Sequence, residues 1–181
     1  SGSHYYAARG AAANGLEVPV RGGQTEAERF LFYRGVGNFE APLQVKTDDE
    51  ARTLSLRNLG TRSLDSLWVV QMRHGRGSFQ RVDALRPEES REVRVAPERQ
   101  WSELGILRHR MREAIQADLI RAGLSESEAS AMVATWEDSW FAESGLRVLY
   151  LLPKDWVDEI LPLRLDPAPQ EVVRVFVGRA E

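Results

Sequence analysis

The sequence contains no cysteine, and this absence excludes several kinds of chemistry. Without thiols the chain cannot form disulfide bonds, build a zinc site on thiolates or use a cysteine nucleophile. The redox state of its compartment stays open. Long apolar runs are missing too. None reaches the roughly 20 residues needed to cross a bilayer, so we expect no membrane span.

An excess of one charge is also missing. The 27 acidic and 24 basic side chains are spread along the chain, and the formal net charge is -3. We therefore expect no basic face suited to a phosphate backbone and no nucleic-acid partner. Lysine is nearly absent, with only Lys46 and Lys154, so almost every basic side chain is an arginine. A GC-rich genome explains this preference for arginine over lysine better than a role of the arginines in binding does.

The chain has 181 residues, of which 43% are hydrophobic, so it can bury a substantial core. We expect a loosely ordered N-terminal arm at residues 1–27, with one short strand at 16–20 before the turn Arg21-Gly22-Gly23. A single α+β domain should follow at residues 28–181. Its predicted parts are a β-rich region at 28–96, a helical hairpin at 99–142 and C-terminal strands at 145–179.

Apolar residues recur with a period of two between residues 42 and 95. Leu54 and Leu56 alternate with polar residues, and Trp68, Val70 and Met72 share one face of another segment. Residues typical of turns end each run, as in Asn58-Leu59-Gly60 and Gly75-Arg76-Gly77. Short strands joined by hairpin-length turns predict antiparallel sheets packed as a sandwich.

Three segments in this region resemble the immunoglobulin-like or fibronectin-type modules of bacterial envelope proteins: residues 54–60, 64–70 and 82–95. The resemblance covers about residues 42–95 and implies an immunoglobulin-like β-sandwich in a periplasmic or secreted protein, with the cytoplasm as the alternative. The chain departs from antibody-type domains because it lacks their cysteine pair. As a whole it is also similar to a bacterial protein family of uncharacterised function.

The helical hairpin is the best specified part of the chain. Apolar residues three and four apart predict a first helix with one buried stripe, made of Trp101, Leu104, Leu107, Met111, Ile115 and Leu119. Gly123 should end this helix, and Ser125 with Glu128 has the spacing of a capping box that begins the second. On the second helix, Met132, Trp136 and Trp140 should face the sheet, with Val133 and Phe141 beside them.

Three further strands are predicted outside the period-two region. Residues 146–152 form a nearly continuous apolar run that is typical of a buried central strand, and a helical turn is expected at 155–160. Residues 172–177 predict the last strand. The aromatic run at residues 29–34 predicts a strand near the beginning that joins the same sheet system.

No motif for catalysis or for a cofactor is found, so we expect a non-enzymatic protein without a cofactor or metal. His109 and Glu113 are spaced as half of a metal site, but a solvated helix pair explains them better. The glycines of residues 35–39 and 75–78 lack the spacing and the lysine of a phosphate loop, so we interpret both segments as turns.

The remaining candidate site is the acidic, tryptophan-containing segment at residues 137–143. Paired carboxylates beside tryptophans are typical of carbohydrate-binding or carbohydrate-cleaving clefts, although Glu137 and Asp138 also fit a solvated helix face. A looser cluster surrounds Trp156. The candidate binding residues are therefore Arg34, Trp136, Glu137, Asp138, Trp140 and Trp156.

Three hypotheses follow from these observations. The first is a non-catalytic, protein-binding module of a bacterial envelope or secreted protein. It would bind its partner through an exposed strand edge or through the outer face of the hairpin, where Arg108, Arg112, Glu126, Glu137 and Asp138 are expected. The second is a carbohydrate-binding domain that uses Trp136, Trp140 and Trp156. The third is an enzyme of unrecognised type around Arg34, Glu137 and Asp138.

Overall fold

The computed structural model describes residues 16–19, 21–28, 38–48 and 52–181. The strand predicted at residues 29–34, and with it Arg34, lies outside the described residues. Within the predicted N-terminal arm, β1 (Leu16–Pro19) and β2 (Thr25–Glu28) form an antiparallel pair. The turn between them contains Gly22 and Gly23, both with positive φ, so the predicted strand and turn are confirmed here.

The first of the two larger sheets has three antiparallel strands in the order β3-β4-β7. These are β3 (Leu43–Thr47), β4 (Thr53–Asn58) and β7 (Ser90–Arg94). Leu54 and Leu56 are fully buried, while Ser55 is half-buried and Arg57 is exposed, which confirms the period-two prediction. Asn58 is buried at the end of β4, and its amide donates to the carbonyls of Arg62 and Leu85 at 2.8 and 3.0 Å. This amide fixes the turn that leads to the second sheet.

The second sheet has five antiparallel strands in the order β10-β9-β5-β6-β8. Its strands are β5 (Leu67–Arg73), β6 (Arg76–Val82), β8 (Ser102–Glu103), β9 (Gly145–Leu152) and β10 (Phe176–Ala180). The β5–β6 turn has positive φ at both His74 and Gly75, as two-residue hairpins of this twist require. β9 confirms the buried strand predicted at residues 146–152.

The helices follow the three-stranded sheet in the chain, as expected from the sequence. They are the short η1 (Glu98–Gln100), α2 (Leu104–Arg121), α3 (Glu126–Glu137), the π-helical η2 (Asp138–Ala142) and α4 (Lys154–Ile160). The capping box of Ser125 and Glu128 is present. The predicted start of the first helix at Trp101 was wrong, because the buried Trp101 precedes α2 and donates its indole N–H to the carbonyl of Ala96 at 2.8 Å.

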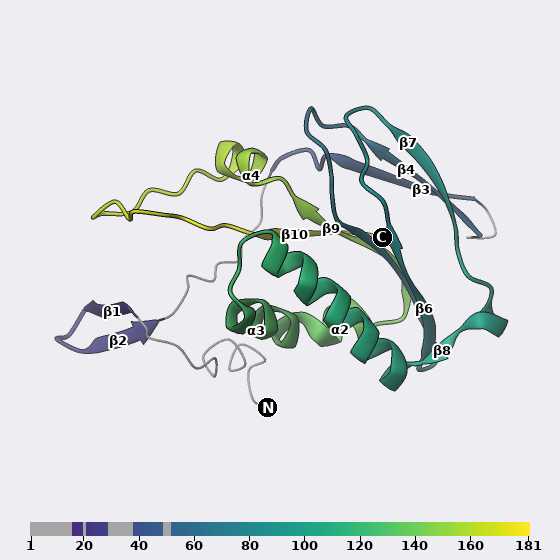
Figure 1. Ribbon diagram of the computed structural model, residues 1–181, viewed down its shortest axis with the longest axis horizontal. Helices are drawn as coiled ribbons and strands as arrows, with labels where there is room; N and C mark the ends of the chain where they lie inside the picture. Colours follow the sequence, from purple (N-terminus) through teal and green to yellow (C-terminus); the bar gives the residue numbers. More distant parts are fainter. Residues whose placement is uncertain (1–15, 20, 29–37, 49–51) are drawn as a thin grey trace.

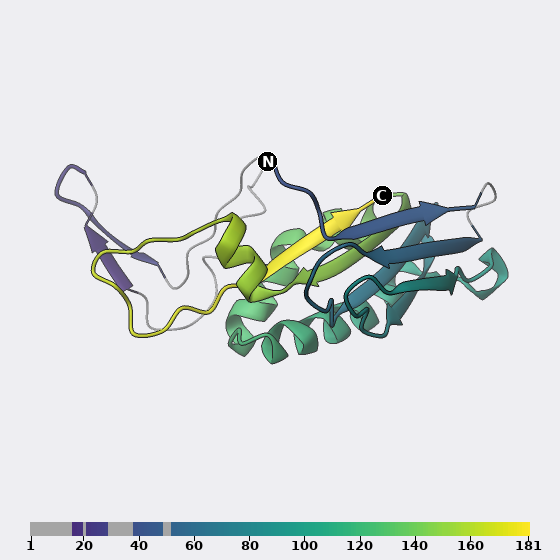
Figure 2. The ribbon, with the colours of Figure 1, turned by 90° about the horizontal axis from the view of Figure 1, so that it is seen from above.

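These elements form three layers, and the five-stranded sheet is the middle one (Figures 1 and 2). One core lies between the two sheets and includes Leu54, Leu67 and Val148. The other lies between the five-stranded sheet and the hairpin and includes Val70, Met111 and Phe141. The structure therefore confirms an α+β protein with two antiparallel sheets and a helical hairpin before the C-terminal strands.

The C-terminal region differs from the prediction. The last strand is Phe176–Ala180 instead of the predicted residues 172–177, of which only residues 176 and 177 belong to it. Gly178 explains this register, because it lies opposite Tyr150 and a Cβ there would lie 2.4 Å from Cζ of that ring. Any residue other than glycine at this position would collide with Tyr150.

Candidate functional site

The structure gathers four of the candidate residues at one end of the hairpin. Trp136 and Glu137 end α3, and Asp138 and Trp140 belong to η2, which continues it. Trp156 lies in α4 instead, where its ring packs edge-on against Phe39 at a centroid distance of 5.4 Å. It contacts the core between the sheets, whereas Trp136 and Trp140 contact the core on the opposite face of the five-stranded sheet. The three tryptophans therefore do not line one cleft.

Glu137 was expected on the exposed face of the hairpin, but its side chain is only 13% exposed. It lies between two arginines of α2: Arg108 approaches it at 3.4 Å and Arg112 donates a hydrogen bond to it. Asp138 is 90% exposed and pairs with Arg108 at 3.3 Å. The expected acidic face is therefore a network of ion pairs that joins α2 to the end of α3.

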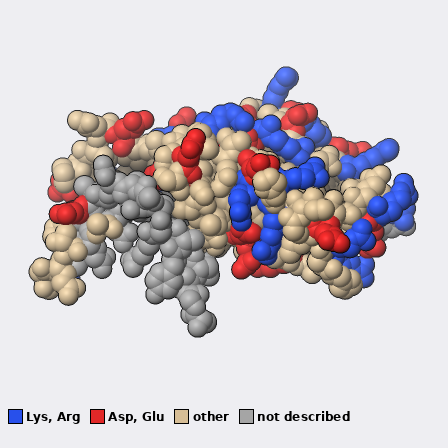
Figure 3. Space-filling view, turned by 60° about the horizontal axis from the view of Figure 1, so that its bottom comes forward, with Lys and Arg blue, Asp and Glu red and all other residues tan. Residues whose placement is uncertain are grey.

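The surface on the side of the helical layer carries charges of both signs. Acidic and basic side chains are interspersed there, with no large field of one sign (Figure 3). Exposed ion pairs lie on this face, such as His109 with Glu113 at 3.3 Å, and pairs of this kind add little to stability. This face is typical of a solvated helix surface.

Trp136 and Trp140 stack on one another, with ring centroids 6.4 Å apart and an angle of 15° between the planes. Trp140 is 5% exposed and also contacts Phe141, which is fully buried. Both Trp140 and Phe141 belong to the core beneath the hairpin. Packing therefore explains these tryptophans, as the sequence spacing indicated.

Beneath this stack, the wider turn of η2 is held by a buried arginine. A helix end leaves carbonyl groups without partners, and a π-helical turn adds to this problem. Arg147 of β9 donates to the carbonyls of Ser139 and Trp140 at 3.0 and 3.2 Å, and also to that of Glu143. Its side chain is 0% exposed. Arg147 thus closes the helix end from the side of the sheet.

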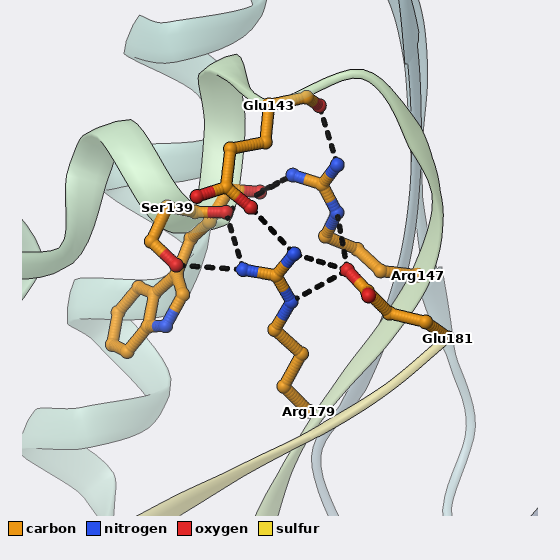
Figure 4. Close-up of polar contacts among 6 residues, drawn as sticks. Ser139, Glu143, Arg147, Arg179 and Glu181 are labelled. Atoms are coloured by element: carbon orange, nitrogen blue, oxygen red, sulfur yellow. Dashed lines mark hydrogen bonds and ion pairs between the residues drawn. The ribbon is translucent and has the colours of Figure 1, made fainter.

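A second arginine, Arg179 of β10, lies beside the first (Figure 4). Its Nη1 donates to the carbonyl and the hydroxyl of Ser139 at 3.0 and 2.6 Å. Its Nη2 donates to Glu143 at 2.6 Å, and its Nε donates to Glu181 at 2.9 Å. Two strands and the helix end are therefore joined by one polar cluster: Ser139, Glu143, Arg147, Arg179 and Glu181.

The charges in this cluster change one another's proton affinity. Burial lowers the pKa of Arg147, and the neighbouring charge of Arg179 lowers it further. Burial also lowers the pKa of Arg179, but hydrogen bonds to Glu181 and Glu143 outweigh this effect, so its pKa is raised overall. The hydrogen bond from Arg179 lowers the pKa of Glu181. Arg179 and Glu181 therefore stabilise one another's charged forms.

β10 forms one edge of the five-stranded sheet, and no strand among the described residues pairs with its outer side. The N–H of Leu151 donates to Ser66 on the β5 side at 2.9 Å, so Val148, Tyr150 and Leu152 of β9 face β10. The backbone N–H and C=O groups of successive residues in a strand point to opposite edges. The backbone of Gly178 therefore forms hydrogen bonds with β9, and the backbone groups of Val177 and Arg179 point outward. No backbone of the described residues bonds to these outward groups.

The edge strand β7 carries more charge than β10 does, and the edge strand β3 carries its one charge in an exposed position. β7 contains Arg91, Glu92 and Arg94 within its five residues, and β3 presents an exposed Lys46. Charged residues on an edge discourage the addition of a further strand. In β10 the one charged residue is Arg179, whose side chain is already paired on the helical face. β10 is therefore less protected by exposed charge than the edge strands β3 and β7 of the three-stranded sheet.

Sequence reasoning missed Arg147 and Arg179. The available signal was a lone arginine inside the otherwise apolar run of residues 146–152, because a charge buried in a strand must find partners. No such signal exists for Arg179, whose partners come from segments distant in the sequence.

Two features are not found in the part of the chain that the structure describes. No three histidine, aspartate or glutamate side chains come together as metal ligands. None of its helices combines the length and the apolar composition of a bilayer-spanning segment. Comparison of the chain with protein-family models, with curated proteins and with solved structures gave no match.

Proposed function

We propose that this chain is a non-catalytic protein-binding module, and that its partner adds an extended segment to the edge strand β10. The main observation behind this proposal is the outer side of β10, where the backbone groups of Val177 and Arg179 point away from the sheet and no described residue bonds to them. Unpaired backbone groups in a strand recognise another strand through main-chain hydrogen bonds. The apolar Phe176–Ala180 segment, with its single charge already paired, favours this use.

The carboxylates of the candidate segment support binding over catalysis. Glu137 is tied to Arg108 and Arg112, and Glu143 to Arg179. A general acid or base needs a carboxyl group that is free to exchange a proton with a substrate. Side chains already engaged with arginines fit a scaffold better than a reaction centre.

We further propose that the scaffold is an immunoglobulin-like sandwich. In such folds strands A, B and E share one sheet and strands C, F and G share the other. The order β3-β4-β7 corresponds to A-B-E, and β10-β9-β5 corresponds to G-F-C, with β6 beside C. The hairpin of α2 and α3 then replaces the connection between E and F. This strand order supports the resemblance noted for residues 42–95.

That resemblance also supports a place in the bacterial envelope or among secreted proteins. Fractionation of cells that express the natural gene product is the test of this location. Recovery in the periplasm or in the medium is expected, and recovery in the cytoplasm alone would contradict it.

The binding proposal is tested by Val177→Pro. Proline removes the N–H of Val177, which points outward, so the ladder with β9 is kept while a partner strand loses a donor. The native protein and the variant are crosslinked in cells, and the captured partners are compared. Gln44→Ala, on the outer face of β3, is the matched control. The proposal predicts that Val177→Pro loses a partner that the native chain and the control retain.

Equal capture by all three proteins would overturn strand addition at β10. Circular dichroism and thermal unfolding verify that Val177→Pro is folded. If the variant does not fold, protection of the Val177 and Arg179 amides in the captured native complex decides the question instead.

A further inference from the structure

We propose that Arg147 and Arg179 form a binding site for an oxyanion, a carboxylate or phosphate group, and that the Glu181 side chain occupies this site in the structure. The site lies on the helical face of β10 and β9, whereas strand addition uses the backbone edge of β10. The two proposals are therefore independent and can fail separately.

The first observation is a donor without a hydrogen bond. The Nε of Arg147 is buried and has no hydrogen-bond partner, although the other nitrogens of this guanidinium bond carbonyl groups. The nearest acidic atom is Oε1 of Glu181 at 4.0 Å, close enough for an ion pair and too far for a hydrogen bond. A buried N–H without a partner is costly, so an oxygen placed nearer would be stabilised there.

The second observation is how Glu181 uses its carboxylate. Both Nε and Nη2 of Arg179 donate to the same atom, Oε1, and the same atom faces Arg147. No hydrogen bond from the described residues reaches Oε2. A group with two free oxygens can instead give one to Arg179 and one to Nε of Arg147. Glu181 therefore occupies the site but leaves the Nε–H of Arg147 without a hydrogen bond.

The third observation concerns the net charge of the two arginines and the access of solvent anions to them. Glu143 contacts Arg179 at 2.6 Å and neutralises one of the two arginines. Without Glu181, one positive charge stays uncompensated beside Arg147, whose side chain is 0% exposed. The Glu181 side chain is 59% exposed, so an anion from solvent can reach the place that it holds. Paired arginines of fixed geometry are the donors that carboxylate and phosphate groups prefer.

In the test, the variant Glu181→Ala removes the carboxylate that occupies the site, and inorganic phosphate or acetate is added at constant ionic strength. The side-chain Nε–H resonances of Arg147 and Arg179 are followed by NMR. We expect saturable shifts of both resonances in the variant and a midpoint at least several-fold higher in the native chain. Bound phosphate should also raise the melting temperature of the variant by about 2–4 °C, the size of shift expected for a weak site in a domain of this length.

Glu98→Ala is the matched control, because Glu98 pairs with Arg73 in an exposed ion pair. Phosphate also stabilises folded proteins non-specifically, so the control defines that background. Equal shifts in both variants would overturn the proposal. A double variant, Glu181→Ala with Arg179→Lys, keeps the positive charge but loses the paired N–H donors of the guanidinium. Unchanged phosphate binding by this double variant would also overturn the proposal. Comparison of the two ions shows whether carboxylate or phosphate binds better. Absence of saturable shifts with both would also overturn it.

Discussion

At the scale of single residues, Arg147 is the clearest case of a charge retained in the interior for its hydrogen bonds. It lies in a strand whose other residues are almost all apolar, and it bonds the carbonyls that η2 leaves without partners. Its burial costs free energy, and the carbonyl bonds with the neighbouring acidic groups offset that cost. The helix end and the strand are thereby held together.

Arg147→Met is therefore expected to destabilise the protein. Methionine fills similar space but leaves the carbonyls of Ser139, Trp140 and Glu143 without a donor, which lowers the free energy of unfolding by about 2–4 kcal/mol. Urea unfolding followed by tryptophan fluorescence measures this loss. Arg73→Met, at an exposed ion pair, should cost less than about 1 kcal/mol. Equal losses in the two variants would show that the carbonyl bonds are unimportant.

Tyr150 makes stability depend on pH at the alkaline end. Burial raises its pKa above the ordinary value, whereas the unfolded chain ionises this phenol near pH 10, the usual range of tyrosine. The stabilising contribution is therefore complete below about pH 10 and is lost as pH rises from there through the folded-state pKa. Tyr150→Phe should weaken the fall of unfolding free energy between about pH 9 and pH 11, as urea titrations can measure. An identical pH dependence in both proteins would contradict this account.

At the scale of secondary-structure elements, the sequence predicted best those features that depend only on residues close together in the chain. The period of two in β4, the shared face of Trp68, Val70 and Met72 in β5 and the capping box of α3 depend on neighbouring residues. All three are confirmed, although β5 is also buried on its other face. The ends of β10 depend on the fit of Gly178 against Tyr150, which is a contact between strands. No local pattern carries that information, so the last strand was misplaced.

The same reasoning explains which parts of the candidate site were predicted. The stack of Trp136 and Trp140 follows from their helical spacing, so it was anticipated as packing. The burial of Glu137 was not, because it requires Arg108 and Arg112 from the other helix of the hairpin. The cluster of Arg147 and Arg179 combines β9, β10 and η2, so only the three-dimensional arrangement shows it.

Ser125→Ala tests the capping box at this scale. The Ser125 hydroxyl accepts a hydrogen bond from the N–H of Glu128, and the Glu128 carboxylate accepts one from the N–H of Ser125. Loss of the hydroxyl should lower the free energy of unfolding by about 1 kcal/mol. Ser130→Ala, at an exposed position inside the same helix, should change it by less than about 0.5 kcal/mol or raise it slightly. Chemical unfolding of both variants compares the two values.

At the scale of the whole molecule, the five-stranded sheet is shared by both cores. Its β5 supplies Leu67 to the core between the sheets and Val70 to the core beneath the hairpin. Neither outer layer can therefore keep its apolar face covered without the middle one. This arrangement favours one cooperative unit for residues 38–181.

Limited proteolysis tests this unity. Cleavage near Arg99, in the exposed segment between β7 and α2, should not release two independently folded pieces, because the fragments share the middle sheet. Size-exclusion chromatography of the cleaved protein should show one folded species or aggregated fragments. Two separate fragments with cooperative unfolding transitions would show two domains.

Hydrogen exchange at β10 tests the central claim most directly. In the free protein, the amides of Val177 and Arg179 should exchange rapidly, while those of Gly178 and Ala180, which face β9, should exchange slowly. Binding of the partner should slow Val177 and Arg179 and leave Gly178 unchanged. Slow exchange of Val177 and Arg179 in the free protein, or no change at β10 in the complex, would contradict strand addition at this edge.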